Sequence, residues 1–254
     1  MPTPSPAGEL RLSTDGAVAT LVIDHPAKRN AMTADMWRAL PALLDRLAAD
    51  RAVRAVVLTG AGETFCAGAD ISSLREQGGS TQGLAVAAEE ALAAFPKPTL
   101  AAVRGHCVGG GCQLAAACDL RFAADGATFG ITPAKLGIVY APGSTQRLVR
   151  LVGPATAKYL LFSGELIDSA RALRTGLVDE VLAEAELDKR VAEFTAVLAA
   201  RSQLTQAAAK EYAAGPAAAD RIAHWEAQAR DAGEAAEGVA AFLERREPRF
   251  TWSV

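Results

Sequence analysis

Short apolar runs bounded by turn-forming residues recur along the first half of the chain. The β-branched run at 18–23 ends at Asp-His-Pro, and the run at 55–58 ends at Thr-Gly-Ala-Gly, so each predicts a buried strand followed by a breaker. The runs at 99–103 and 120–123 predict two more strands. Strands that alternate with glycine turns and helical patterns are typical of an α/β architecture with much parallel pairing.

Helical spacing of apolar residues occupies the segments between these strands. Thr33 is a candidate N-cap for the first helix, and Pro41 inside that helix is expected to kink it or to shift its start. An Ala-rich helix is expected to lead to Phe95, and a short helix is expected over 112–118. The polar, glycine-bearing stretch 72–83 is expected to be a mobile loop.

The last part of the chain has a different pattern, because strand signals stop at about Glu184. Stretches rich in Ala, Leu, Glu and Arg at 187–200 and 217–246 predict amphipathic helices. A helical tail without strands of its own often docks on a neighbouring chain, so we expect an oligomer. The expected division is a disordered lead at 1–9, an α/β core at 10–195 and a helical oligomerisation region at 196–254.

Composition and charge narrow the functional classes. The chain of 254 residues has a net charge of −3 and a pI near 5.7, so it offers no basic field for nucleic acid. No window approaches the roughly 18 apolar residues of a membrane span. The start, Met-Pro-Thr-Pro-Ser-Pro, lacks the features of a secretion signal. We therefore expect a cytoplasmic protein with neither a membrane nor nucleic acid as a partner.

The cysteines do not predict a metal site. They have no CxxC spacing. The whole chain contains only three histidines, so no obvious set of zinc ligands is present. Buried free thiols in a reducing compartment are the expected state. The four cysteines are Cys66, Cys107, Cys112 and Cys118.

Two glycine-containing segments carry the candidate chemistry. Residues 65–71 follow one predicted strand, and residues 105–113, with three consecutive glycines, follow another and open a helix. N–H groups at a helix start have no intrahelical partner and carry the positive end of the dipole. Two such turns side by side would aim two N–H groups at one oxygen, as in an oxyanion hole. The alternative is that the glycines only close turns; a dinucleotide-binding fingerprint is excluded because its spacing is absent.

These two segments, in this order and about forty residues apart, resemble the paired oxyanion-hole motifs of the crotonase (enoyl-CoA hydratase/isomerase) superfamily. The resemblance covers nearly the whole chain, from about Leu10 to Phe250. The further motifs that carry it lie at 25–32, 117–121, 129–130, 136–137, 143–148, 176–179 and 242–248.

The resemblance implies a fold, an assembly and a substrate. The fold would be α/β, a crotonase-like spiral of ββα units followed by a C-terminal helical trimerisation region, and the assembly would be a homotrimer or a dimer of trimers. The substrate would be an acyl-CoA thioester, with coenzyme A as part of the substrate and no separate cofactor. The backbone N–H groups of Ala69 and Gly110 would bind the thioester oxygen and stabilise its enolate.

The same resemblance assigns substrate-binding residues. The stretch from Ala69 to Ser72 would run beside the thioester and the pantetheine. Lys28 and Arg29 would contact the nucleotide end of CoA; the alternative is two solvated loop charges. The substrate-binding set is Lys28, Arg29, Ala67, Ala69, Asp70, Ile71, Ser72 and Gly110.

The sequence departs from the family pattern at the acid–base positions. Hydratases of this family use two glutamates, and a gap-free alignment places Gln113 and Pro133 at those positions. Neither side chain exchanges a proton in the working pH range. Gln113 would still orient a water through its amide, whereas Pro133 has no polar side-chain group. The departures argue against an efficient hydratase or a single-glutamate isomerase and favour a non-standard lyase or isomerase.

The loop at 132–140 resembles the Thr-Pro-Ala-x-Leu-Gly-x-x-Tyr loop of methylmalonyl-CoA decarboxylases in the same superfamily. In those enzymes the tyrosine lies by the malonyl carboxylate, so Tyr140 is a candidate; the alternative is a loop tyrosine with a packed ring and a solvated hydroxyl. Decarboxylation needs a carboxylate held out of plane and a stabilised enolate rather than a strong base. Ala69 is a departure, because those decarboxylases can carry histidine there.

Other polar residues have open roles. His106 either titrates near neutrality as a catalytic group or bonds a backbone carbonyl. Asp70 either contacts substrate or caps a helix that begins at Ile71, and Glu165 is expected on the surface. The leading functional hypothesis is an acyl-CoA lyase or isomerase, with decarboxylation as its sharper form. The alternatives are an acyl-CoA-binding protein without chemistry and a purely structural oligomer.

Overall fold

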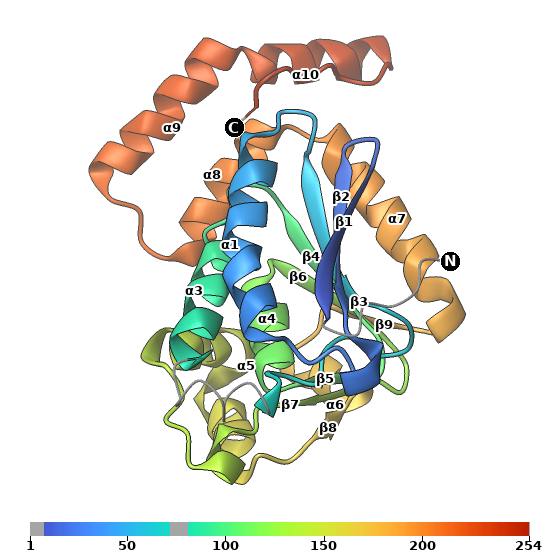
Figure 1. Cartoon of the computed structure of the whole chain (residues 1–254). Helices are drawn as coiled ribbons and strands as arrows, with labels where there is room; N and C mark the ends of the chain where they lie inside the picture. Colours follow the sequence, from blue (N-terminus) through green and yellow to red (C-terminus); the bar gives the residue numbers. More distant parts are fainter. Residues whose placement is uncertain (1–7, 72–80, 254) are drawn as a thin grey trace.

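The computed structural model describes residues 8–71 and 81–253, and a mostly parallel sheet forms its centre (Figure 1). The strands lie in the order β1-β2-β3-β4-β6-β9. β1 pairs antiparallel with β2, and the later neighbours pair parallel, which confirms the α/β prediction. The strands are β1 Glu9–Asp15, β2 Val18–Asp24, β3 Ala55–Gly60, β4 Thr99–Val103, β6 Leu120–Ala124 and β9 Glu180–Leu182.

A second, smaller sheet supports the glycine-containing segments. β5 (His106–Val108) pairs parallel with β7 (Thr128–Gly130), which pairs antiparallel with β8 (Ile167–Asp168). The sequence predicts a turn over 105–111 and a helix from 112. That prediction is wrong in detail, because β5 occupies part of the turn and the helix begins earlier, at Gly110.

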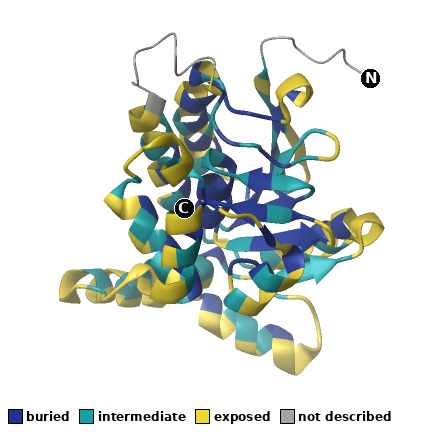
Figure 2. Ribbon diagram, turned by 90° about the horizontal axis from the view of Figure 1, so that it is seen from below, coloured by how far each residue is buried: buried dark blue, intermediate teal, exposed yellow. Residues whose placement is uncertain are grey.

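Helices cover both faces of the main sheet (Figure 1), and the sheet between them is the most buried part of the chain (Figure 2). Apolar residues of α1 (Ala34–Ala49), α3 (Thr81–Ala93) and α4 (Gly110–Ala117) join one buried cluster with the strands. α7 (Glu184–Ala200) covers the opposite face. In β3, alternate residues join the two clusters, as the two-residue period of a strand requires.

The first helix begins where its cap predicts. The Thr33 hydroxyl accepts the Met36 N–H at 3.3 Å, and Pro41 lies inside the helix without shifting its start. The predicted mobile loop at 72–83 is wrong over its last residues, because 81–83 form the beginning of α3. Its residues 72–80 lie outside the described residues.

The C-terminal region is helical, as predicted, but its helices are divided differently. The sequence predicts a helix over 217–246, whereas Gly233, with φ of 66°, separates α9 (Ala219–Ala232) from α10 (Glu234–Glu244). α8 is Gln203–Ala214. Figure 1 shows α9 and α10 reaching away from the rest of the chain.

The expected division of the chain stays a prediction, and two elements cross its boundaries. Residue 195, the expected end of the core, lies within α7, which continues to Ala200. β1 begins at Glu9, inside the expected lead, and residues 1–7 lie outside the described residues. The remaining elements are η1 Pro26–Lys28, η2 Pro133–Leu136, α5 Pro142–Ser163 and α6 Ser169–Thr175.

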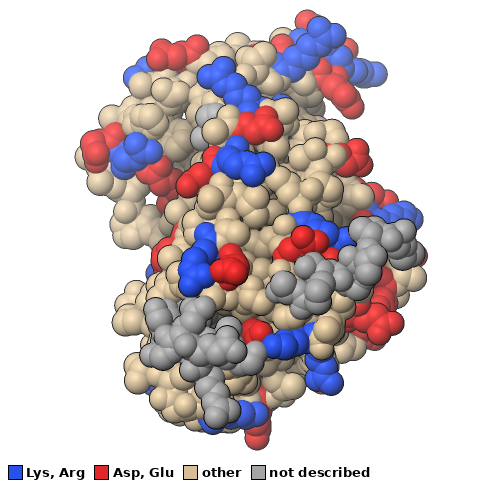
Figure 3. Space-filling view, in the orientation of Figure 1, with Lys and Arg blue, Asp and Glu red and all other residues tan. Residues whose placement is uncertain are grey.

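The four cysteines are buried and free, as predicted. Burial raises the pKa of the Cys66 thiol and of the Cys118 thiol to about 12, so both stay protonated at neutral pH. None of the described helices is long and apolar enough to cross a bilayer. Basic and acidic side chains are interspersed over the face shown in Figure 3.

Candidate active site

The two glycine-containing segments lie side by side. Cys66 and Cys107 form a parallel bridge, in which the Cys66 N–H donates to the His106 carbonyl at 2.9 Å and the Val108 N–H donates to the Cys66 carbonyl at 3.0 Å. A Cβ on Gly111 would lie 2.2 Å from the Cys66 carbonyl oxygen. The approach of the two segments therefore requires glycine at position 111.

The N–H groups of Ala69 and Gly110 are available at this junction. Ala69 pairs with Met32, but the bridge uses the Met32 N–H, which donates to the Gly68 carbonyl at 2.8 Å, and the Asp70 N–H, which donates to the Met32 carbonyl at 2.9 Å. Gly110 is the first residue of α4, so its N–H has no intrahelical partner. Neither N–H has a backbone acceptor among the described residues.

The two N–H groups lie close enough to share one acceptor. An ideal Cβ on Gly110 would lie 3.5 Å from the Ala69 nitrogen, and one on Gly68 would lie 3.4 Å from the Gly110 nitrogen. The dipole of α4 adds positive potential at Gly110. An oxygen placed between the two groups would accept two hydrogen bonds, which is the chemistry of an oxyanion hole.

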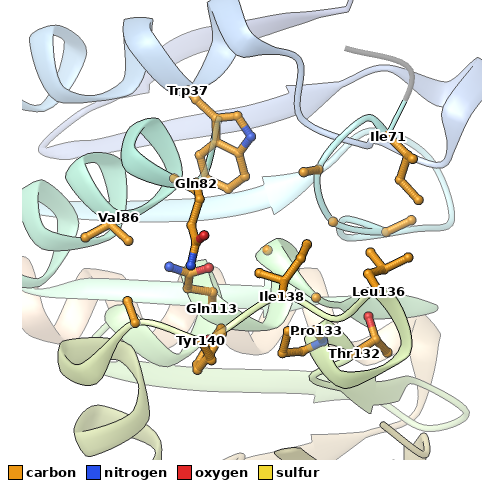
Figure 4. A pocket seen from close by; sticks show the side chains of 17 residues that line it. Trp37, Ile71, Gln82, Val86, Gln113, Thr132, Pro133, Leu136, Ile138 and Tyr140 are labelled. Atoms are coloured by element: carbon orange, nitrogen blue, oxygen red, sulfur yellow. The ribbon is translucent and has the colours of Figure 1, made fainter. Parts of the chain in front are cut away.

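A cavity of about 150 Å³ opens beside these groups. In Figure 4, Trp37 of α1 and Gln82 of α3 lie on one side, and Gln113 of α4 and Tyr140 lie on the other. Within the described part of the chain, Tyr140 carries the only titratable side chain of the lining. The lining residues are Trp37, Ala67, Gly68, Ala69, Ile71, Gln82, Ala85, Val86, Gly109, Gly110, Gln113, Thr132, Pro133, Leu136, Ile138, Tyr140 and Ala141.

The cavity brings together several residues of the predicted site and leaves others outside. The predicted residues in its lining are Ala67, Ala69, Ile71, Gly110, Gln113 and Tyr140. The predicted residues that are absent from the lining are Lys28, Arg29, Asp70 and His106. Ser72 lies outside the described residues. Both positions of the missing glutamates, Gln113 and Pro133, line the cavity.

The loop that carries Lys28 is tied to the first glycine segment. The Lys28 ammonium donates to the Asp70 carboxylate at 2.7 Å, and the Ala67 N–H donates to the Arg29 carbonyl at 3.0 Å. The Arg29 side chain is exposed. Lys28 is thus half-exposed and ion-paired rather than simply solvated, and both cations lie on the loop that flanks Ala69.

His106 is absent from the cavity lining. Its Nδ1 lies 3.0 Å from the Thr128 hydroxyl, across the β5–β7 pair. The predicted backbone carbonyl partner is wrong, because the strand pairing places a threonine directly opposite. His106 therefore links two strands beneath the glycine turn. Glu165 is exposed, as predicted.

Gln113 is held by a buried cluster that the sequence did not reveal. Its amide nitrogen donates to Glu89 Oε2 at 2.5 Å and to Ser144 Oγ at 3.2 Å. The Ser144 hydroxyl also donates to Glu89 Oε2, and the Arg147 guanidinium donates to Glu89 Oε1. Only 1% of the Glu89 side chain is exposed, so its charge is compensated inside the protein.

Tyr140 lies at the cavity with its ring partly buried. Burial raises the pKa of its phenol well above the usual range, and the negative charge of nearby Glu89 raises it further. The hydroxyl is therefore protonated at neutral pH and can serve as a hydrogen-bond donor rather than as a base.

The sequence of this chain is similar to known proteins over nearly its whole length. The sequence model of the enoyl-CoA hydratase/isomerase family matches residues 13–252. This chain belongs to that family. It is 35% identical to the crotonyl-CoA hydratase of Syntrophomonas wolfei over 252 residues, which cover 94% of this chain and 96% of that protein. It is 41% identical to the short-chain-enoyl-CoA hydratase of Clostridium acetobutylicum over 181 residues, 69% of each chain.

A solved structure of an enoyl-CoA hydratase/isomerase family member has the same fold. It superposes with a TM-score of 0.91 at 38% identity and covers 97% of this chain and 98% of its own. The crotonase superfamily and its fold, which the sequence motifs suggested, are thereby confirmed. The family consists of enzymes that act on acyl-CoA thioesters, so this protein is an enzyme of that class by membership.

Sequence reasoning missed two residues at the site, Trp37 and Glu89. Trp37 lines the cavity, and its indole N–H is buried without an acceptor among the described residues. Glu89 was hidden in an Ala-rich helix, but its spacing offers a signal. It lies four residues after Ala85 and three before Leu92, on the face that packs inward. A carboxylate at an apolar position of a helix indicates a buried partner.

Proposed function

We propose that this protein is an acyl-CoA enzyme that stabilises a thioester enolate with the N–H groups of Ala69 and Gly110. One observation carries the proposal: two N–H groups that have no backbone acceptor among the described residues meet beside an apolar cavity. Donors aimed at the site where charge develops lower the barrier for enolate formation. The loop with Lys28 and Arg29 would contact the nucleotide end of CoA.

The reaction class follows from what the lining lacks. An enoyl hydratase adds water with positioned acids and bases, and the described lining contains no carboxylate or imidazole. The chemistry is therefore a non-standard lyase or isomerase reaction rather than efficient hydration. Incubating the protein with 2-enoyl, 3-enoyl and methylmalonyl thioesters, and separating the products by chromatography with mass detection, tests this. Rapid gain of water by an enoyl thioester would contradict it.

Decarboxylation of a methylmalonyl-type thioester is the specific reaction we favour. Loss of carbon dioxide needs an orienting donor and a stabilised enolate, and Tyr140 is a buried, protonated donor at the cavity. A protein that binds acyl-CoA without turning it over is the alternative. It would bind every thioester of the panel and change none of them.

Tyr140→Phe is expected to slow decarboxylation by about ten- to a hundredfold, because a hydrogen bond to a charged group contributes about 1.5–3 kcal/mol. The measurement is carbon dioxide release from methylmalonyl-CoA. Tyr212→Phe is the control, since Tyr212 lies on α8 outside the cavity lining. Unchanged release by the Tyr140 variant would eliminate the hydroxyl's role.

We also infer a homotrimer or a dimer of trimers that uses the C-terminal helices. α9 has no buried residue in the single chain, and the Phe242 and Leu243 side chains of α10 are 82% and 74% exposed. Large apolar side chains at such exposure are typical of a covered interface. Light scattering is expected to give three or six times the chain mass of 26.3 kDa. A monomeric mass at micromolar concentration would refute the assembly.

A further inference from the structure

The buried cluster behind Gln113 dictates which way its amide faces. Glu89 Oε2 accepts hydrogen bonds, and its carboxylate pairs with the Arg147 guanidinium, so the group of Gln113 that faces Glu89 is the amide nitrogen. Ser144 donates its own proton to Glu89, so its oxygen is left to accept from Gln113. The nitrogen end of the Gln113 amide is thus held inside the cluster.

The carbonyl end of the Gln113 amide is left for the cavity. Its Oε1 receives no hydrogen bond from the described residues, and Gln113 lines the cavity (Figure 4). Gln113 lies three residues after Gly110 on α4, so the two are neighbours on one helix face, about 5–6 Å apart. A thioester whose oxygen binds at Gly110 would extend its acyl chain through the same cavity past Gln113, which would bring a substituent on its third carbon within reach of Oε1.

We propose that Glu89 is a positioning residue that fixes Gln113 as a hydrogen-bond acceptor in the cavity, so that the site selects acyl groups with a hydroxyl at the third carbon over acyl groups with a carbonyl there. The inference rests on the acyl-CoA site proposed above. A hydroxyl donates to Oε1, whereas a carbonyl oxygen meets it lone pair to lone pair. A malonyl carboxylate, which also only accepts, is turned away from Gln113 toward the Tyr140 donor.

Substituting Glu89 by glutamine is expected to reverse which end of the Gln113 amide faces the cavity. Arg147 has only donors, so the amide oxygen of the new side chain faces Arg147 and its NH₂ group faces Gln113. Gln113 then turns its own oxygen toward that NH₂ group and presents its NH₂ group to the cavity. The shape of the cluster is kept, and the group that Gln113 presents to the cavity changes from an acceptor to a donor.

The experiment compares dissociation constants of butyryl-, 3-hydroxybutyryl- and 3-oxobutyryl-CoA by calorimetry, with chromatography to verify that each thioester is unchanged afterwards. In the wild-type protein, 3-oxobutyryl-CoA is expected to bind about tenfold more weakly than 3-hydroxybutyryl-CoA. In Glu89→Gln the ratio of the two dissociation constants, 3-oxobutyryl-CoA over 3-hydroxybutyryl-CoA, is expected to fall to about one or below. The reason is that a hydroxyl and a carbonyl both accept from an NH₂ group.

Glu90→Gln is the matched control. Glu90 is the next residue of α3 and also pairs with Arg147, at 3.2 Å, but its side chain is exposed and makes no bond to Gln113. It should keep the wild-type ratio. Gln113→Leu removes the amide altogether and should bring the ratio near one, which covers the case in which Glu89→Gln does not fold.

The outcomes separate the inference from the proposed function. Butyryl-CoA has no polar group at the third carbon, so its binding reports on the acyl-CoA site alone. If the three thioesters all fail to bind to the wild-type protein, the proposed function fails and the inference falls with it. If butyryl-CoA binds but the ratio is the same in wild type and Glu89→Gln, or wild type binds the two polar thioesters equally, only the role of Glu89 is overturned.

Discussion

Gly110→Pro is expected to reduce turnover of the acyl-CoA substrate by about 10²–10³-fold, because it deletes one of the two proposed oxyanion donors. Gly110 is the first residue of α4, a position where proline fits the helix geometry and where the N–H has no helical partner to lose. Gly109, before it, has φ of 55° and ψ of −120°, outside the α region that a following proline disfavours.

Gly110→Ala is the matched control for this substitution. A Cβ at this position would lie 3.0 Å from the Trp37 ring, so both variants crowd the same neighbour and differ mainly in the N–H. The alanine variant is expected to retain most of the activity. If proline and alanine lowered kcat equally, the loss would come from crowding at Trp37, and the assignment of the Gly110 N–H would be wrong.

Gly111→Ala is expected to lower the free energy of unfolding by about 3 kcal/mol or more, the upper range for overpacking of a core. The added Cβ would lie 2.2 Å from the Cys66 carbonyl oxygen, and backbone cannot move aside as a flexible side chain does. Denaturant unfolding measures the change. Since the same contact brings the two glycine segments together, acyl-CoA binding should weaken in parallel.

Gly83→Ala is the control for a glycine-to-alanine change without a clash. Gly83 lies in α3 with no atom near its missing Cβ, so alanine should stabilise the protein by about 0.5–1 kcal/mol. A Gly111→Ala protein as stable as the wild type would contradict the close packing of the two segments.

The sequence predicted those parts of the fold that have a local signature. β2, β3, β4 and β6 of the main sheet are apolar runs long enough to be recognised, and Thr33 marks the first helix through its cap. β1, which is largely polar, and β9, which has three residues, were missed from the sequence. β5, β7 and β8 have at most three residues each and exist because they pair with one another, so no local pattern predicts them. The break at Gly233 was missed because an amphipathic pattern continues on both sides of it.

The candidate site, like the fold, has parts with a local sequence signature and parts without one. The glycine-containing turns after buried strands are visible in the sequence, and the family resemblance singles out Ala69 and Gly110 within them, both of which line the cavity. Glu89, Gln113 and Ser144 come from three different helices, so their cluster forms only when α3, α4 and α5 pack together. Predicting a pairwise bond between residues 24 apart in sequence requires the tertiary structure.

The central claim is that two backbone N–H groups polarise the thioester carbonyl, and infrared difference spectroscopy tests it without knowledge of the reaction. Butyryl-CoA labelled with carbon-13 at the carbonyl would be bound to the wild-type, Gly110→Ala and Gly110→Pro proteins. We predict that the carbonyl band moves to lower frequency on binding to the wild-type and alanine proteins, and that much of this shift is lost in the proline protein. A bound carbonyl at its solution frequency in the wild-type protein, or an equal shift in all three, would contradict the oxyanion hole.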